Sequence, residues 1–329
     1  PRVSLPQPMP MQRSLKTIVP ILVIAVASAG LVGALHYQHA RLRAQSSAYW
    51  TRRMEASADA THSSVEAWLD ERQEDDRLMA RRAARNPKLF DAHRVREAAG
   101  VELEEVVTEL AAERGYRGIW VVRADGSTVE ASKFADALPA AVREAAMLSA
   151  SNGKSASIGP LPITDGQIFA VIEPVMASGA GHAMKPIGAV ILGIDPYETL
   201  YPLVLREQSG IESARHRLVQ HVGDQLVVLT PSKFPQAKAG ELHMPWGSAP
   251  IVGKLAAEGK DSSGAMLGIG DVPIIAATRR VPEAGWGIIR SLSQQEAFAP
   301  VEHEFQLEKT FALSIFLIGI VAWYFLRRH

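Results

Sequence analysis

Cysteine is absent from the 329 residues, so disulfide bonds cannot stabilise the fold and no thiol can serve as a nucleophile or metal ligand. Net charge is absent as well, because 35 Lys and Arg residues balance 35 Asp and Glu residues. No stretch interleaves cations with aromatic side chains in the way that a nucleic-acid surface does. We therefore expect no nucleic-acid partner, and a fold that relies on one or two apolar cores.

The motifs of common catalytic sites are also lacking. The sequence has no Gly-x-Ser-x-Gly, no Gly-x-x-x-x-Gly-Lys and no His-Glu-x-x-His. Its histidines are scattered, and His216 and His221, five positions apart, do not share a helical face as metal ligands would. We predict no catalytic residue, no metal site, no cofactor and no enzymatic activity for the chain as given. An exported enzyme is an alternative, and it would show a cleft that holds a matched acid and base.

Two uncharged apolar runs, residues 17–35 and 310–326, lie near the two ends of the chain. At about 1.5 Å per residue, each nearly crosses a hydrocarbon core of roughly 30 Å, so we predict two transmembrane helices. Residues typical of membrane interfaces lie at their ends: Arg13 and Lys16 precede the first run, and Trp323 and Tyr324, followed by Arg327 and Arg328, close the second. One alternative is that the runs are core helices. Another is a signal peptide cleaved after 27–29, but apolar sequence continues to Leu35 and favours an uncleaved anchor.

The cations that flank the two runs give a mixed indication of orientation. Arg327 and Arg328 follow the second run directly and favour a cytoplasmic C-terminus, although Arg41 and Arg43 follow the first. Because long domains are translocated largely regardless of their charge, we place both termini in the cytoplasm and residues 36–309 outside.

A long helix is predicted directly after the first run. No proline or glycine occurs between residues 36 and 85, and strong helix formers dominate that segment. Asn86 and Pro87 should end the helix, and a second helix follows at 101–113. A stripe at helical spacing, apolar at first and polar further down, consists of Val65, Trp68, Leu69, Arg72, Asp76 and Met79.

After residue 115 the pattern becomes one of short strands that occur in two similar sets. Asp125 and Gly223 mark turns of two hairpins and lie 98 positions apart, and Asp195 and Ser293, which begin two capping-box patterns, show the same shift. Two copies of one α+β unit explain this better than the alternative, a chance recurrence of hairpins. The predicted strands are 118–122, 127–129, 168–172, 187–194, 218–222, 226–229, 272–278 and 286–291, with helices at 138–150 and 249–258.

Short phrases mark the end of each unit. Residues 186–196 and 200–203 end the first unit, and residues 279–282, 285–288 and 295–297 end the second. Together with the long helix that leaves one apolar run and the helix that returns into the other, these phrases resemble double Cache domains. These are PAS-like extracytoplasmic sensor domains of bacterial transmembrane signalling receptors.

The resemblance covers about residues 36–309 and implies an α+β fold, with a long N-terminal helix and two antiparallel-sheet modules flanked by two transmembrane helices. It also implies a location in the bacterial inner membrane, with the central domain periplasmic or extracellular, and a homodimer. A small molecule would bind in the membrane-distal module, and the signal would cross the second span to a histidine kinase, diguanylate cyclase, phosphodiesterase or chemotaxis module. None of these output modules lies within the 329 residues.

The expected organisation follows the chain from end to end. Its parts are a cytoplasmic N-terminus (1–16), transmembrane helix 1 (17–35), a stalk helix (36–85), a membrane-distal module (86–210), a membrane-proximal module (211–300), a connecting helix (301–309), transmembrane helix 2 (310–326) and the start of a cytoplasmic output region (327–329). Membrane lipid is accordingly an expected partner. In the first span, Ala25, Ala29 and Gly33 form a face of small residues on which two copies could approach each other.

Four residues are candidates for ligand contact. Trp120 could stack on a ligand or belong to the core, and Arg117 and Arg123 could clamp a carboxylate or be solvated. Glu173 lies in an apolar strand and is either an edge residue or a polar contact in the pocket. Asp195 is interpreted as a helix cap.

The amino-acid pocket of the family uses an arginine, paired aromatics and a later aspartate. Residues 116–120 share the residue types but not the adjacent aromatic pair, so the motif does not predict amino-acid binding. A membrane-anchored adaptor without a ligand is the alternative function.

Proteolysis of intact spheroplasts tests this topology. Protease added outside should degrade residues 36–309 and spare a cytoplasmic control protein, since only the central domain is exposed in the predicted orientation. A central domain that survives until the membrane is lysed would contradict the prediction.

Overall fold

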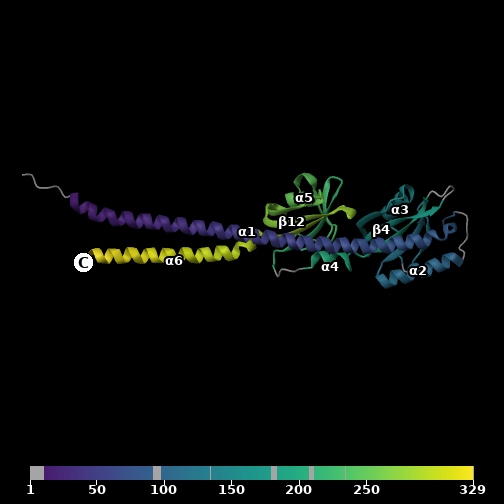
Figure 1. The fold of residues 1–329 in the computed structure, drawn as a ribbon, viewed down its shortest axis with the longest axis horizontal. Helices are drawn as coiled ribbons and strands as arrows, with labels where there is room; N and C mark the ends of the chain where they lie inside the picture. Colours follow the sequence, from purple (N-terminus) through teal and green to yellow (C-terminus); the bar gives the residue numbers. More distant parts are fainter. Residues whose placement is uncertain are drawn as a thin grey trace, which may run out of the picture. The chain divides into compact units, whose positions relative to one another are not determined.

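The computed structural model describes residues 11–91, 98–133, 135–178, 184–206, 211–233 and 235–328. Its contacts divide the chain into two compact units. One unit is Thr51–Ser293, and the other combines the two ends, Pro1–Trp50 and Gln294–His329. The fold is α+β, with a long N-terminal helix followed by antiparallel sheets, which confirms this part of the predicted fold class (Figure 1).

The N-terminal helix α1 runs from Met11 to Ala84 and so includes both the first apolar run and the predicted stalk. It ends before Asn86 and Pro87, as predicted, and the short helix η1 (Pro87–Phe90) follows. The predicted stripe is buried in large part, including the carboxyl side chain of Asp76. Helix α2 (Ala98–Arg114) comes next.

The first sheet is five-stranded and antiparallel. Its order is β2-β1-β5-β4-β3, with β1 (Gly118–Arg123), β2 (Thr128–Ala131), β3 (Ala156–Ile163), β4 (Gly166–Ser178) and β5 (Met184–Ile194). Helix α3 (Ala140–Asn152) packs on one face, while α1 and α2 contribute to the apolar cluster on the other. Strand β3 was not predicted, because its prolines at 160 and 162 obscure a strand pattern. They are tolerated because β3 is an edge strand.

The end of the first module corrects a detail of the sequence analysis. Helix α4 spans Leu200–Leu205 and therefore does not begin at Asp195. One carboxylate oxygen of Asp195 accepts a hydrogen bond of 2.8 Å from the backbone N–H of Tyr197, which closes a local turn before the helix. Glu198 then lies outside the helix, so the predicted capping box does not form.

The second sheet has six strands in the order β10-β7-β6-β13-β12-β11. The elements of this module are β6 (Arg215–Val222), β7 (Gln225–Val228), β10 (Leu242–Pro245), β11 (Ser262–Leu267), β12 (Pro273–Val281), β13 (Trp286–Ser293), the small pair β8 (Ser232–Lys233) and β9 (Gln236–Ala237), α5 (Ile251–Ala257), and the short helices η3 (Trp246–Ser248), η4 (Ile269–Asp271) and η5 (Pro282–Ala284). The sequence pattern predicted neither the small pair β8 and β9 nor β10 and β11. The boundaries predicted for the two modules stay predictions.

One apolar cluster joins α1 to both sheets. In its centre Trp68 of α1, Phe169 of β4 and Trp286 of β13 lie in a row, with ring centroids 5.6 Å and 5.0 Å apart. The side-chain amide of Gln167 links the sheets by polar contacts, since it donates to the carbonyl of Ala239 and accepts from the hydroxyl of Tyr201, both at 2.5 Å. The two sheets therefore share a core.

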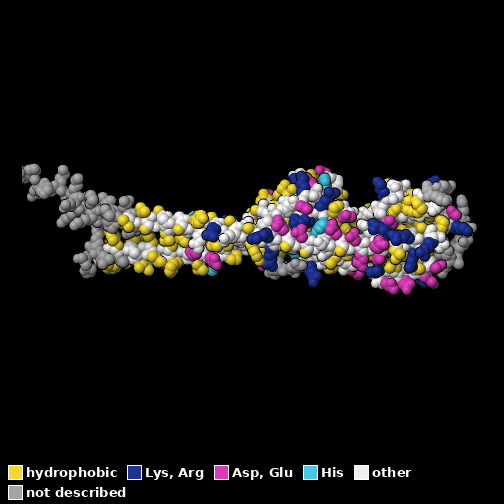
Figure 2. Space-filling model, in the orientation of Figure 1, with side chains coloured by type: hydrophobic (Ala, Val, Ile, Leu, Met, Phe, Trp, Pro, Cys, Tyr) yellow, Lys and Arg dark blue, Asp and Glu magenta, His cyan; other side chains and the backbone are white. Residues whose placement is uncertain are grey.

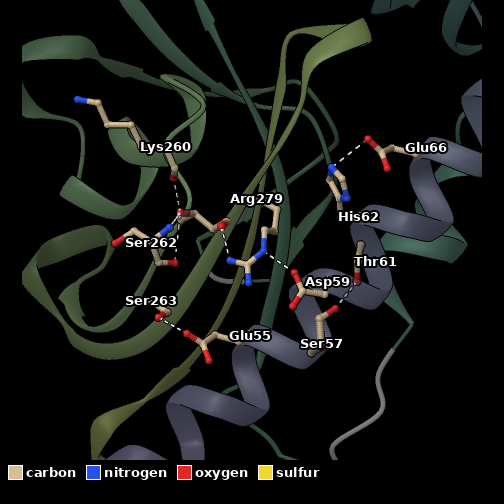
Figure 3. Close-up of polar contacts among 11 residues, drawn as sticks. Glu55, Ser57, Asp59, Thr61, His62, Glu66, Lys260, Ser262, Ser263 and Arg279 are labelled. Carbon is tan, nitrogen blue, oxygen red and sulfur yellow. Dashed lines mark hydrogen bonds and ion pairs between the residues drawn. The ribbon is translucent and has the colours of Figure 1, made fainter.

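Polar side chains attach α1 to the second sheet (Figure 3). Glu55 accepts a hydrogen bond of 2.5 Å from Ser263, and one turn further along the helix Asp59 accepts one of 2.5 Å from the guanidinium of Arg279. This hydrogen bond lowers the pKa of Asp59 below its ordinary value. Beyond it, the buried guanidinium of Arg290 donates to the hydroxyl of Thr61.

The unit made of the chain ends contains α1 up to Trp50 and helix α6 (Gln294–Arg328). Ser46 and Trp50 both donate to the carbonyl of Ala297 at 3.1 Å, and Gln38 bonds to Glu308 at 3.3 Å, so the two helices are antiparallel. The connecting helix and the second predicted span are continuous in α6.

Within the described part of the chain, α6 is the one helix that is long and apolar enough to cross a membrane, over Gln294–Phe325. Its large hydrophobic side chains are exposed from Leu307 to Phe325, and Figure 2 shows hydrophobic surface there. The first predicted span, 17–35, includes side chains outside the described residues, and it stays a prediction.

Replacing Thr61 by Val tests the attachment of α1 to the second sheet. This change keeps the side-chain shape but removes the hydroxyl that accepts the hydrogen bond of the Arg290 guanidinium. Arg290 is only 3% exposed, so water cannot easily replace that acceptor. We expect the free energy of unfolding to fall by about 1.5–3 kcal/mol, measured by denaturant titration of the full chain. Ser64→Ala on the exposed face of α1 is the control, and equal effects of the two variants would contradict the prediction.

Candidate ligand-binding site

A pair of glycines in the first sheet makes room for a tryptophan ring. Gly118 of β1 and Gly193 of β5 lie opposite each other, and the ring of Trp120 covers both. A Cβ atom on Gly118 would lie 2.7 Å from this ring, and one on Gly193 would lie 2.6 Å from it. Because neither residue has a side chain, the ring can lie against the sheet.

Trp120 is 3% exposed and packs in the cluster between the sheet and α3. Its indole N–H donates a hydrogen bond of 3.1 Å to the carbonyl of Asp136, in the loop between β2 and α3. The polar end of the ring is thus satisfied, while its apolar face is held in one orientation.

Arg117, immediately before β1, lines the same small cavity as the Trp120 ring. Its Nε atom is 3.2 Å from a carboxylate oxygen of Asp136, and its Nη1 atom is 3.6 Å from one of Asp195. Nη1 also donates to the backbone carbonyl of Asp165 at 3.2 Å. Three segments that are distant in the sequence are therefore gathered around one guanidinium.

These residues surround a cavity of about 500 Å³. Its apolar wall includes Trp120, Leu138 and Ile168, and its polar wall includes Arg117 and the two aspartates Asp136 and Asp165. The volume lies within the range of small-molecule sites, which combine apolar walls with a few polar groups. The arrangement can hold a small molecule with one apolar and one charged or polar end.

The structure brings two of the four candidate residues together. Arg117 and Trp120 line one cavity, whereas Arg123 lies at the other end of β1, about 20 Å along the strand at roughly 3.3 Å per residue. Arg123 donates to the carbonyl of Leu89 and to the hydroxyl of Ser127, both at 3.2 Å. The two arginines are therefore too far apart to clamp one carboxylate.

Glu173 lies on β4, an interior strand of the first sheet. Its neighbours at 171 and 175 belong to the cluster on the α1 face, so strand alternation directs Glu173 to that face and away from the Trp120 cavity. One of its carboxylate oxygens accepts a hydrogen bond of 2.5 Å from Ser155. Any binding role of Glu173 or Arg123 stays a prediction.

Asp136, Leu138 and Gly193 were not singled out by the sequence analysis. Asp136 and Leu138 lie in an irregular loop, and Gly193 pairs with Gly118, which is 75 positions away in the sequence. No local periodicity reveals such contacts. The amino-acid pocket of the family includes a later aspartate, but the sequence alone does not show which aspartate of this chain corresponds to it.

A larger cavity of about 910 Å³ lies between the β3–β4 hairpin and the second sheet. Its buried polar group, the amide of Gln167, already has partners in Ala239 and Tyr201. Its charged lining side chains, Lys238 and Glu241, are exposed, whereas the Arg117 side chain is only 18% exposed and lies beside the buried Trp120. The Trp120 cavity is for this reason the better candidate, although it is smaller.

No protein-family model matches the chain, and no curated protein matches its sequence. Solved structures do match. The sensor domain of the V. cholerae histidine kinase DctB has a TM-score of 0.52 at 15% identity and covers 74% of this chain and 97% of its own. The sensory domain of the Campylobacter jejuni chemoreceptor Tlp3 has a TM-score of 0.56 at 11% identity and covers 78% and 98%.

A third similar structure is the ligand-binding domain of the Pseudomonas fluorescens chemoreceptor CtaA in complex with L-isoleucine. It has a TM-score of 0.50 at 18% identity and covers 80% of this chain and 98% of its own. At these identities the likeness is one of fold. The chain has the fold of the extracytoplasmic sensor domains of histidine kinases and chemoreceptors, the Cache type that the sequence resembles.

Replacing Gly193 by Ala tests whether the glycine pair shapes the cavity. The new methyl group would clash with Trp120 and Ile168, so the ring must move toward the cavity. We expect a loss of stability of about 1–3 kcal/mol and a change in tryptophan fluorescence. Gly247→Ala is the control, because nothing lies within 4 Å of a Cβ atom there. An unchanged stability and spectrum in Gly193→Ala would contradict the proposed packing.

Proposed function

We propose that this chain is the sensor part of a membrane receptor and that a small molecule binds in the Trp120 cavity of the first module. The observation that carries the proposal is the convergence of Arg117, Trp120 and Asp136 on one partly apolar cavity. The shared fold with sensor domains supports the role.

The charge around the cavity favours a ligand with a positively charged amino group. The described lining has one cation, Arg117, against the carboxylates of Asp136 and Asp165, and Asp195 also faces the guanidinium. An ammonium group near these carboxylates would relieve the excess of negative charge, and an apolar part would cover Trp120. L-valine and L-isoleucine have this chemistry and were crystallised with Tlp3 and CtaA, respectively.

Transmission to the cytoplasm forms the second part of the proposal. The chain would be anchored in the bacterial inner membrane by the runs 17–35 and 310–326, with residues 36–309 outside. A ligand that prefers one packing of the first module against α1 shifts the balance between two packings by its difference in affinity. Displacement of the second span would then change the activity of a cytoplasmic module.

Ligand binding by the full chain in detergent tests this function. L-valine, L-isoleucine and other small amines, each near 100 times the dissociation constant, should add about 2.7 kcal/mol of stability in thermal-shift measurements. Asp136→Asn should weaken binding about fivefold, since a partly exposed charge contributes roughly 1 kcal/mol.

Glu144→Gln, an exposed carboxylate on α3, is the matched control and should leave affinity unchanged. If no small molecule shifts the midpoint, the alternative function, an adaptor without ligand, is favoured instead. If binding occurs but Asp136→Asn and Glu144→Gln behave alike, the site lies elsewhere.

A further inference from the structure

Asp76 is a carboxyl group fully buried between α1 and the first sheet. Its exposed fraction is 0%, and neither of its oxygens has a hydrogen-bond partner among the residues that the structure describes. Apolar residues of the same helix, Leu69 and Met79, are buried in the cluster on this face. Burial of an ionised carboxylate without partners is very costly, so the group must be neutral or the contact must open.

A second carboxyl group faces it from the sheet. Glu173 of β4 projects toward the α1 face in the same row as Val121 and Val190, which belong to the cluster that α1 completes. Glu173 is half-buried and accepts a hydrogen bond of 2.5 Å from Ser155. Two carboxyl groups on facing elements resist simultaneous ionisation.

The other charged groups around Asp76 do not neutralise it. Its neighbour Asp75 accepts a hydrogen bond of 2.6 Å from the Tyr116 hydroxyl and adds negative charge. Arg77, on α1, is the nearby cation, but its guanidinium is engaged by Gln73 at 3.3 Å and Glu74 at 3.7 Å. The other cations here are Arg114 of α2, which lies 3.6 Å from Asp75, and Arg72 of α1, whose guanidinium lies over the Trp68 ring and pairs with Glu71.

We propose that Asp76 and Glu173 form a proton-binding site, which holds a proton on Asp76 while α1 is packed on the first sheet and releases it to solvent when this contact opens. The site makes the attachment of the long helix to the first module sensitive to external pH. It is separate from the Trp120 cavity, which lies on the opposite face of the sheet.

The direction of the effect follows from the proton balance. An aspartate in an unfolded chain has a pKa of about 3.9, while burial, and next the charge of Glu173, raise the pKa of Asp76 well above this value. Between the two values the packed state retains a proton that the open state has lost, so rising pH favours opening. The packed state begins to lose stability near pH 4, and the equilibrium constant between the packed and the open state changes by up to tenfold per pH unit. The change levels off above the raised pKa of Asp76.

Stability of the full chain in detergent, measured by denaturant titration from pH 4 to pH 8, tests the proposal. The wild type should lose stability as pH rises, and Asp76→Asn, which resembles the protonated acid, should be more stable at pH 8 and lack this loss. Asp70→Asn, at an exposed position of the same helix, should follow the wild type. Equal pH dependence in Asp76→Asn and the wild type would overturn the proposal.

Glu173→Gln provides a second test that does not depend on the folding of Asp76→Asn. It keeps Asp76 but removes the facing negative charge, so the loss of stability should begin from the same pH and level off at a lower pH. An unchanged profile would show that the pair does not act together. Recovery of wild-type stability at pH 8 on adding Ca²⁺ would also overturn the proposal, because it would assign the site to a metal cation.

Discussion

The burial of one face of α1 against both sheets is the constraint on which the central unit depends. The face of each sheet that is turned toward α1 depends on this helix for its cover. The cluster on that side contains Trp68 of α1, Phe169 of the first sheet and Trp286 of the second. At about 25 cal/mol per Å² of apolar surface, such shared burial is a major favourable contribution. Polar contacts such as those of Thr61 then fix which turn of the helix meets which strand.

The candidate site lies on the other face of the first sheet, where a different element covers the strands. Gly118 and Gly193 let an aromatic ring lie flat there, and Arg117 is held by acidic side chains from separate segments. This separation has a functional meaning. A ligand bound in the Trp120 cavity, as proposed, would alter the packing on the α3 face without having to enter the core that holds α1.

Sequence patterns predicted the parts of the fold that have a local cause. The stalk helix followed from the absence of proline and glycine in 36–85, and the paired hairpins followed from turn residues and alternation. Strands β3, β10 and β11 were not predicted, because prolines or weakly apolar residues interrupt their patterns and only pairing with neighbouring strands orders them. The pair β8 and β9 was not predicted either, because two residues per strand are too few to show a pattern. Short-range capping logic also placed the start of α4 too early, at Asp195.

The site was predictable only in part for a related reason. Arg117 and Trp120 lie close together in the sequence and share one cavity, but Asp136 reaches it from a loop, which no periodicity records. Asp76 fell within the predicted stripe of α1, at the point where it turns polar, and the sequence could not show that the stripe stays buried there. Tertiary contacts decide which polar residue on a helix face is buried away from water.

Strand β4 combines contacts that are otherwise distributed over the central unit. Near its start, Gln167 contacts the second module, Ile168 lines the Trp120 cavity and Phe169 belongs to the shared aromatic row. Further along, Glu173 faces the stalk helix. A sideways movement of this one strand, even by a fraction of an ångström, would change all four of these contacts together. The proposed ligand and the proposed response to external pH would thus both act on β4 before a structural change is transmitted to the membrane.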